Sequence, residues 1–414
     1  MGASDHPVSG VSRAWKLMLG DGNCPRMRSP KKIFLVWLCG SMLLLTGFGG
    51  VFFSRPKLKV DKGAQLFQKN VFFENAELGG WIASITWGRL SRDPEAKIVV
   101  TGRRGAAFVT AEGILRSLVQ FAAGERGAGR VIPVDVENDG LCEFMDNDGS
   151  GFLVSLFDHQ GRRLWQYPPV QRLDQGPIDI TAGVPSRMAA GDLDADNTLD
   201  FVVGMVGEGS RGIHRLDAKG RVQWIHEANW PFHVEIVDTN NDGRPEIVYS
   251  SGGAPWSASA GIFILDADGH IIRRIVKGGI FGVGSFSLCR WRTTESRYYI
   301  LKRSPRRFQL LNFSGEVIAQ FPVSNGEIRA QGTPVQFESK DRPFFALMTS
   351  FLATKGRSVL YIYNSEQKLI YKETLSATLP CLTAVPDRAT GGEVLLVGLD
   401  DGKVWRYRLK PSAP

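Results

Sequence analysis

The sequence predicts an all-β chain, a seven-bladed β-propeller preceded by a single N-terminal transmembrane helix. A strand–turn–strand phrase that recurs along the chain predicts the blades, and one uncharged apolar stretch predicts the helix. The composition, with 43% hydrophobic and 22% charged residues among 414, excludes an intrinsically disordered chain. The formal charge of +8 is modest for this length and does not indicate a nucleic-acid-binding protein, and five cysteines do not make a disulfide scaffold.

The apolar stretch covers residues 33–53, which carry no charge over 21 positions and are long enough to cross a bilayer as a helix. Lys31 and Lys32 precede it directly. A cleaved signal peptide is the main alternative, but the 32 residues before the stretch are long for such a leader and no A-x-A-like cleavage site follows. We therefore expect an uncleaved anchor at 33–53 after a short cytoplasmic tail at 1–32.

The distribution of basic residues predicts the orientation of this anchor. Six lysines and arginines precede it and four follow it within ten residues, which favours a cytoplasmic N-terminus. The expected localisation is a single-pass membrane protein whose propeller lies on the periplasmic or extracellular side. Residues 54–80 are expected to form a linker, and residues 81–410 the propeller.

Seven turns, each between two alternating strands, supply the repeat. They lie at Gly113, Gly161, Gly220, Gly269, Gly315, Gln367 and Gly402, separated by 35 to 59 residues. Glycine provides the positive φ that a tight hairpin turn needs. Further strands precede most hairpins, and four strands per repeat of this length are typical of a propeller blade. Stacked β-sandwiches are the alternative, but they would need linker-like changes in composition, which the sequence lacks.

Three repeats contain an acidic loop between their first and second strands, with oxygen-bearing side chains at loop positions 1, 3, 5 and 9. The loops contain Asp135, Glu137, Asp139 and Glu143; Asp192, Asp194, Asp196 and Asp200; and Asp238, Asn240, Asp242 and Glu246. Ca²⁺ takes six to eight oxygen ligands in flexible geometry, so this spacing predicts two or three structural Ca²⁺ sites. The alternative is that the side chains cap backbone N–H groups of the turns without a metal ion.

The segments GDLDADNTLDFVVG and IVDTNNDGRPEIVYS resemble the FG-GAP/VCBS repeat family, and the resemblance covers roughly residues 132–251. It implies a seven-bladed propeller of the integrin-α type with calcium loops between the first and second strands. It implies little about biological role, because the family includes adhesion, scaffold and enzyme-accessory proteins. The corresponding loops of the other four repeats lack the full oxygen set, so no metal is expected there.

No nucleophile elbow, P-loop, H-E-x-x-H or C-x-x-C motif is present, which favours a binding protein over an enzyme. The sequence thus predicts a membrane-anchored, calcium-stabilised β-propeller acting as an extracytoplasmic binding or scaffold module for a protein complex or a glycan. The alternatives are a propeller enzyme, such as a polysaccharide lyase or a quinoprotein-like dehydrogenase, and a purely structural subunit of an envelope complex.

Strand topology predicts which residues face a partner. The acidic loops and the hairpins lie on one rim of a propeller, and the loops on the other rim are longer and richer in aromatic residues. Long loops on a rigid scaffold commonly carry function. Trp230, Trp256 and His226 are therefore the expected partner-binding residues, although packing of the tryptophans between blades is an equal alternative.

Overall fold

In the computed structural model, the described residues belong to one compact unit, Val60–Pro414. The residues that the structure describes are 66–410, apart from 89, 122–130, 148–153, 168–187, 206–210, 230, 253–259, 278–285, 305, 324–326, 339–342, 352–356 and 378–380. The predicted cytoplasmic tail, the predicted anchor and most of the predicted linker lie outside the described residues.

The predicted localisation, a single-pass membrane protein, is contradicted. No helix among the described residues is long and apolar enough to cross a membrane. The helix that the structure describes is the three-residue 3-10 segment η2 (Ala76–Leu78). Residues 33–53, on which the prediction rests, are not among the described residues.

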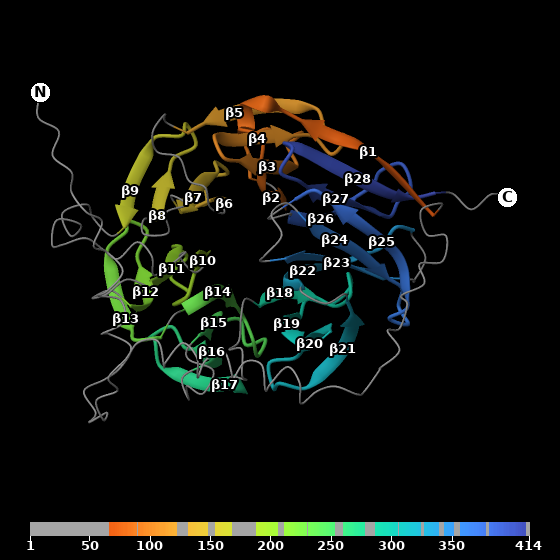
Figure 1. Ribbon diagram of the computed structural model, residues 1–414. Coiled ribbons are helices and arrows are strands. Elements are labelled where there is room, and N and C mark those ends of the chain that lie inside the picture. Colours follow the sequence, from red (N-terminus) through yellow and green to blue (C-terminus); the bar gives the residue numbers. More distant parts are fainter. Residues whose placement is uncertain are drawn as a thin grey trace, which may run out of the picture. The chain divides into compact units, whose positions relative to one another are not determined.

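The predicted seven-bladed all-β propeller is confirmed. Seven antiparallel four-stranded sheets form the Val60–Pro414 unit and are arranged in a ring (Figure 1). Blade 1 comprises β2 (Ile82–Trp87), β3 (Ile98–Gly102), β4 (Gly105–Val109) and β5 (Leu115–Gln120); blade 2 comprises β6 (Val131–Val134), β7 (Glu143–Asn147), β8 (Val154–Phe157) and β9 (Arg163–Tyr167). Blade 3 comprises β10 (Met188–Gly191), β11 (Asp200–Met205), β12 (Gly212–Leu216) and β13 (Val222–His226).

The remaining blades follow the same order. Blade 4 comprises β14 (Pro231–Val237), β15 (Glu246–Ser251), β16 (Gly261–Leu265) and β17 (Ile271–Lys277); blade 5 comprises β18 (Ser287–Arg290), β19 (Tyr298–Ser304), β20 (Arg307–Leu311) and β21 (Val317–Pro322). Blade 6 comprises β22 (Glu327–Val335), β23 (Phe344–Phe351), β24 (Ser358–Tyr363) and β25 (Leu369–Leu375); blade 7 comprises β26 (Cys381–Pro386), β27 (Glu393–Gly398), β28 (Lys403–Leu409) and β1 (Phe67–Glu74).

Blade 7 is closed by β1, the first strand among the described residues, which differs from the sequence interpretation. The turn at Gly402 joins the second and third strands of blade 7, and β1 pairs with β28 as the fourth strand. The predicted linker therefore contains a propeller strand. Lys69 of β1 forms an ion pair with Glu373 of blade 6 at 2.7 Å, and Glu373 also accepts a hydrogen bond from Tyr407 at 2.7 Å. These contacts fasten the closing strand and its neighbour β28 to blade 6.

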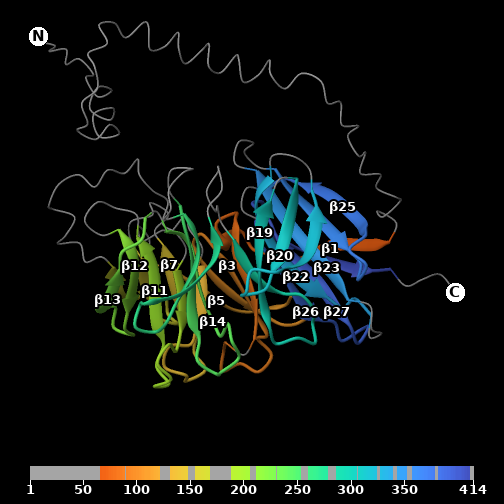
Figure 2. The same ribbon diagram turned by 90° about the horizontal axis from the view of Figure 1, so that it is seen from below.

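In every blade the first strand lies nearest the centre of the ring and the fourth lies at its circumference (Figure 1). Because neighbouring strands are antiparallel, first-to-second loops and third-to-fourth hairpins lie on one rim, and the other connections lie on the opposite rim. Figure 2 shows the strands running between these rims. We call the first the hairpin rim.

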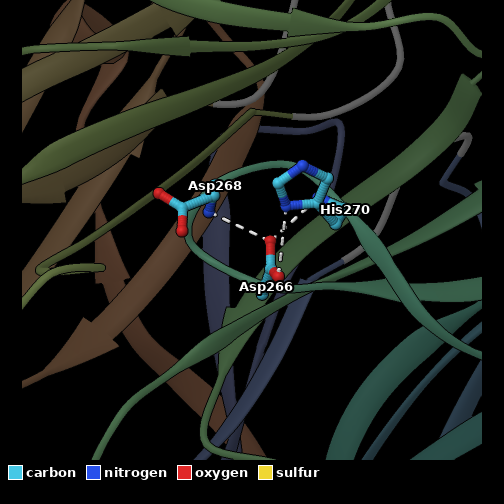
Figure 3. A group of neighbouring side chains, drawn as sticks. All are labelled: Asp266, Asp268 and His270. Atoms are coloured by element: carbon cyan, nitrogen blue, oxygen red, sulfur yellow. Dashed lines mark hydrogen bonds and ion pairs between the residues drawn. The ribbon is translucent and has the colours of Figure 1, made fainter.

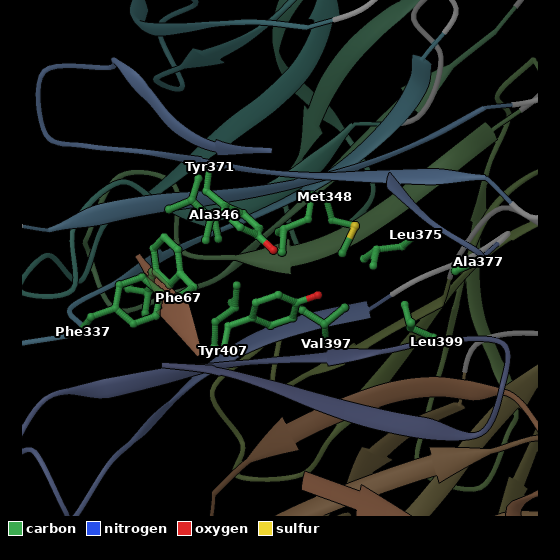
Figure 4. Close-up of a cluster of buried hydrophobic side chains, with 14 residues drawn as sticks. Phe67, Phe337, Ala346, Met348, Tyr371, Leu375, Ala377, Val397, Leu399 and Tyr407 are labelled. Carbon is green, nitrogen blue, oxygen red and sulfur yellow. The ribbon is translucent and has the colours of Figure 1, made fainter. Parts of the chain in front are cut away.

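Each boundary between consecutive blades holds one cluster of buried apolar side chains. Figure 4 shows the cluster between blades 6 and 7, where Met348 lies on the blade 6 side and Phe67 and Tyr407 on the blade 7 side. Both faces of each sheet are therefore covered. This explains why second strands such as β11 read as continuous apolar runs rather than alternating ones.

The hairpin glycines have a second role besides their positive φ. At Gly220, with φ of 76°, a Cβ atom would lie 2.8 Å from Trp165 on the outer strand of the preceding blade. The Trp165 indole N–H donates to the Ala218 carbonyl of the same hairpin at 3.0 Å. Trp224 makes the equivalent bond to Ala267 of blade 4 at 2.8 Å. The position of the hairpin glycine therefore marks a contact between blades as well as a turn.

Candidate metal loops and partner surface

The three acidic loops lie where the sequence predicts, between the first and second strands of blades 2, 3 and 4 on the hairpin rim. They share one backbone geometry. The position 9 carboxylate accepts a hydrogen bond from the position 2 N–H in each loop: Glu143 from Val136 at 2.9 Å, Asp200 from Leu193 at 3.1 Å and Glu246 from Thr239 at 2.8 Å. Position 1 likewise caps N–H groups inside each turn. The capping that the sequence offers as an alternative to metal binding is thus present in all three.

The Asp135 loop of blade 2 contacts one arginine of the preceding blade. Arg92 donates to the Asp139 carboxylate at 2.8 Å, and the Arg92 side chain is 65% exposed. Glu137, at position 3, is exposed. Burial, followed by the carboxylates of the same loop, raises the pKa of Glu143 above its ordinary value. Arg92 therefore balances only part of the negative charge of this loop, at the exposed Asp139.

The Asp192 loop of blade 3 holds a buried arginine. Arg215, from β12, donates to both carboxylate oxygens of Asp200 at 2.8 Å each. It also donates to Asp194, and it contacts the carbonyl of Ala267 in the next blade at 3.1 Å. The guanidinium therefore lies between the carboxylates at positions 3 and 9.

The Asp238 loop of blade 4 has no comparable cation. Among the described residues, no lysine, arginine or histidine forms an ion pair with Asp238, Asp242 or Glu246. The donor between these carboxylates is the neutral amide of Asn240, which contacts Asp242 at 3.0 Å and Glu246 at 2.9 Å. Asp242 and Glu246 thus share the Asn240 amide, and no described cation contacts them or Asp238.

These contacts decide how well each loop fits calcium. The Asp238 loop fits by ligand type and charge, because three carboxylates and an amide are groups that Ca²⁺ takes and no described cation balances the carboxylates. Its Asn240 amide would have to turn its oxygen, in place of its nitrogen, toward the ion. The Asp135 loop fits if the exposed Arg92 turns toward solvent. The Asp192 loop does not fit, although Asp192, Asp194 and Asp200 bring their oxygens within 4.8 Å of one another, because Arg215 already bridges two of them.

Sequence reasoning missed Arg215, although a signal was present. Arg215 lies two residues before Asp217, the first residue of its hairpin, and pairs with Val202 in the sheet. The equivalent residues pair with Met145 in blade 2 and Val248 in blade 4, and they are the buried Leu156 and Ile264. Alignment of the repeats at the hairpin aspartate would have shown one arginine where the two other acidic repeats have an apolar residue.

A second group of possible metal ligands lies in the hairpin of blade 4 (Figure 3). Asp266 accepts hydrogen bonds from the backbone N–H groups of Asp268 at 3.0 Å and His270 at 2.8 Å, and its carboxylate lies 3.5 Å from the His270 ring. The same turn occurs at Asp158 and Asp217, where an arginine takes the place of the histidine. These bonds close the hairpin, and the group needs no metal to account for it.

Of the predicted partner-binding residues, Trp230 and Trp256 lie outside the described residues. His226 ends β13 and contacts the Tyr249 hydroxyl of blade 4 at 3.0 Å, with the rings edge to face. Burial lowers the pKa of His226 below its ordinary value. The described contacts of His226 therefore join two blades, and its role toward a partner stays a prediction.

The structure adds a cavity of about 310 Å³ between blades 5 and 6 on the hairpin rim. Its lining residues come from two first-to-second loops and one hairpin: Trp291, Arg292, Thr293, Thr294, Gln336, Pro343, Phe344, Phe345, Asn364 and Ser365. Trp291 packs on Phe345 at a ring separation of 5.4 Å, and Arg292 is 60% exposed. The described lining residues thus combine aromatic walls with the exposed cation of Arg292.

No protein-family model matches the chain, and no curated protein matches it. Among solved structures, the chain is similar to BBS1N in a crystal structure of its complex with ARL6DN, with a TM-score of 0.51 and 13% identity over 84% of this chain and 97% of that one. It is also similar to the Pan2 WD40 domain of Neurospora crassa, with a TM-score of 0.48 and 10% identity over 83% of this chain and 96% of that one. The similarity to BBS1N shows the fold alone. The resemblance to FG-GAP/VCBS repeats stays a prediction.

Proposed function

We propose that the chain is a binding module rather than an enzyme: a β-propeller scaffold that holds a protein partner on its hairpin rim and is stabilised by calcium. The observation that carries the binding proposal is the cavity between blades 5 and 6. The similar BBS1N propeller, whose structure was solved with ARL6DN, supports a role in protein recognition.

The lining of the cavity suits a protein surface. Tryptophan and arginine are enriched among the residues that dominate binding energy at protein interfaces. Trp291 is held in place by Phe321 at 5.7 Å and Phe345 at 5.4 Å, so its orientation is fixed before a partner arrives. A preorganised aromatic wall loses little side-chain entropy on binding, which favours affinity.

The proposed calcium role belongs first to the Asp238 loop. Asp238, Asn240, Asp242 and Glu246 would hold the ion, and its charge would offset the repulsion among three carboxylates. An ion that binds only the folded state stabilises it by mass action. The effect would be structural, since the ion would fasten a loop at the start of β15 on the rim that also contains the cavity.

The partner proposal is tested with Arg292→Glu in the full chain. Arg388→Glu is the matched control, because Arg388 is 70% exposed on a first-to-second loop of another blade on the same rim. Proteins enriched by the wild-type chain are purified and their dissociation constants measured by calorimetry. We expect Arg292→Glu to weaken binding roughly 10-fold or more, a loss of about 1.4 kcal/mol, and Arg388→Glu to leave it unchanged. Equal affinities for both variants would contradict this surface assignment.

A further inference from the structure

Arg215 is unusual among the cationic side chains near the acidic loops because it is buried. Its side chain is 9% exposed and that of its partner Asp200 is 8% exposed, whereas Arg92 at the Asp135 loop is 65% exposed. All three guanidinium nitrogens of Arg215 donate a hydrogen bond: Nε and one terminal nitrogen to Asp200, the same nitrogen to Asp194, and the other to Ala267. A buried charge with this many partners is satisfied without water.

The contacts of Arg215 reach three segments of the propeller. Asp194 and Asp200 lie at positions 3 and 9 of the acidic loop, Arg215 lies on the third strand of the same blade, and Ala267 lies in the hairpin of blade 4. The Ala267 carbonyl also accepts the indole N–H of Trp224 at 2.8 Å. Arg215 therefore joins the acidic loop of one blade to the hairpin of the next.

We propose that Arg215 is the resident cation of the Asp192 loop: its guanidinium draws Asp194 and Asp200 together in place of a metal ion, so that this loop folds without calcium. The planar guanidinium suits this place because it binds one carboxylate through two parallel hydrogen bonds and stays charged at all relevant pH values. A lysine would supply the charge but not the paired geometry.

Removal of the guanidinium would leave four aspartates at loop positions 1, 3, 5 and 9 with no cation among them: Asp192, Asp194, Asp196 and Asp200. These oxygens, at this spacing, are the set that the sequence predicts to bind calcium. The Asp192 loop therefore has the ligands of a calcium site, but the Arg215 guanidinium occupies the place of the ion.

The experiment uses the full chain with Arg215→Ile, which gives blade 3 the residue that blade 4 has at the equivalent Ile264. Melting is recorded with excess EGTA and with excess calcium, and bound calcium per chain is counted by mass spectrometry after desalting. In EGTA we expect the melting temperature to fall by roughly 5 °C or more, because the partners of a buried ion pair are left uncompensated. Calcium should restore part of that loss and add one bound ion relative to wild type.

Arg221→Met is the control, because Arg221 is also paired with an aspartate of blade 3 but is 72% exposed. Arg221→Met should change neither the number of calcium ions bound per chain nor the rise in melting temperature that calcium produces. If Arg215→Ile does not fold, Arg215→Lys keeps the charge and should melt lower than wild type without gaining an ion.

The single variant Asp194→Asn, which keeps Arg215, can overturn the proposal. Asp194 is 46% exposed, so the variant should fold, and its calcium content should equal that of wild type. Loss of one bound ion would show that the wild-type loop holds calcium and that Arg215 does not replace it. Calcium at the Asp238 loop is tested separately by Asp242→Asn, so either conclusion can fail while the other stands.

Discussion

The acidic loops of blades 3 and 4 have the same spacing of oxygens, and in both the N–H groups at positions 2, 6 and 7 donate to the side chains at positions 9, 1 and 5, yet the two loops balance their charge differently. In blade 3 the buried Arg215 bridges two aspartates, whereas in blade 4 no described cation contacts Asp238, Asp242 or Glu246. The residue that decides the difference lies on the third strand, at Arg215 in one blade and Ile264 in the other. The spacing of a loop thus defines where a cation belongs, but the neighbouring strand decides whether the protein supplies it.

The largest difference between the two loops should appear on removal of their position 9 carboxylates. Asp200→Ala removes the buried acceptor of two Arg215 hydrogen bonds and leaves only the partly exposed Asp194 as a carboxylate partner, so it should lower the free energy of unfolding by roughly 3–5 kcal/mol, equally in calcium and in EGTA. Glu246→Ala should lower the free energy of unfolding less in EGTA than in calcium. In EGTA it removes one of three carboxylates that repel one another, whereas in calcium it removes a proposed ligand of the ion. Urea unfolding of both variants in both buffers measures this. If the loss of unfolding free energy depends on calcium to the same degree in both variants, the two loops do not differ in how their charge is balanced.

The next effect is the response of the wild-type chain to metal. Calcium at 100 times its dissociation constant should add about 2.7 kcal/mol to the stability measured in EGTA. Magnesium at the same concentration should add much less, because it demands near-octahedral geometry and keeps its water. Melting curves in the three buffers give the comparison, and equal protection by both ions would indicate general charge screening.

A smaller effect is expected from Arg92→Met at the Asp135 loop. Exposed ion pairs are worth about 0–1 kcal/mol, so loss of the Arg92 contact should change stability by no more than that. The contrast with Arg215→Ile tests whether burial makes the difference between the two arginines. A loss as large as that of Arg215→Ile would contradict this explanation.

The smallest effect concerns pH in the absence of calcium. Burial, followed by neighbouring carboxylates, raises the pKa of Glu143 above 4.5, its ordinary value. The folded state therefore binds the proton more tightly than the unfolded state, and the stability present at low pH is lost as the pH rises through the raised pKa. Glu143→Gln removes the titrating group. In EGTA its melting temperature should fall less than that of wild type as the pH rises from about 5 to about 7. Parallel profiles would show that Glu143 does not contribute.

Much of the fold could be predicted from local chemistry. Hairpin glycines such as Gly220 mark both a positive φ and a close contact between blades, so their period gives the number of blades. The closing strand could not be found this way, because β1 pairs with β28 across almost the whole chain and carries no hairpin of its own. The repeat therefore predicts Gly402 as a third-to-fourth hairpin, whereas it joins the second and third strands of its blade.

The candidate sites show the same difference between features made by neighbouring residues in the sequence and features made by distant ones. Oxygen spacing located the three acidic loops, because all ligands of such a loop lie within nine residues. It could not show that the Asp192 loop is already bridged, because Arg215 is brought there by strand pairing from 15 residues beyond Asp200. The cavity at Trp291 was also missed, since its walls come from blades 5 and 6.

The most direct test compares one matched substitution in the two loops. Asp196 and Asp242 both occupy position 5, are exposed, and each accept the position 7 N–H at 2.8 Å, so Asp196→Asn and Asp242→Asn should perturb the turn alike. Isothermal calorimetry with calcium on the two variants and wild type measures the number of bound ions. The account predicts that Asp242→Asn loses one ion and Asp196→Asn loses none. Loss of an ion from Asp196→Asn, with Asp242→Asn unchanged, would contradict it.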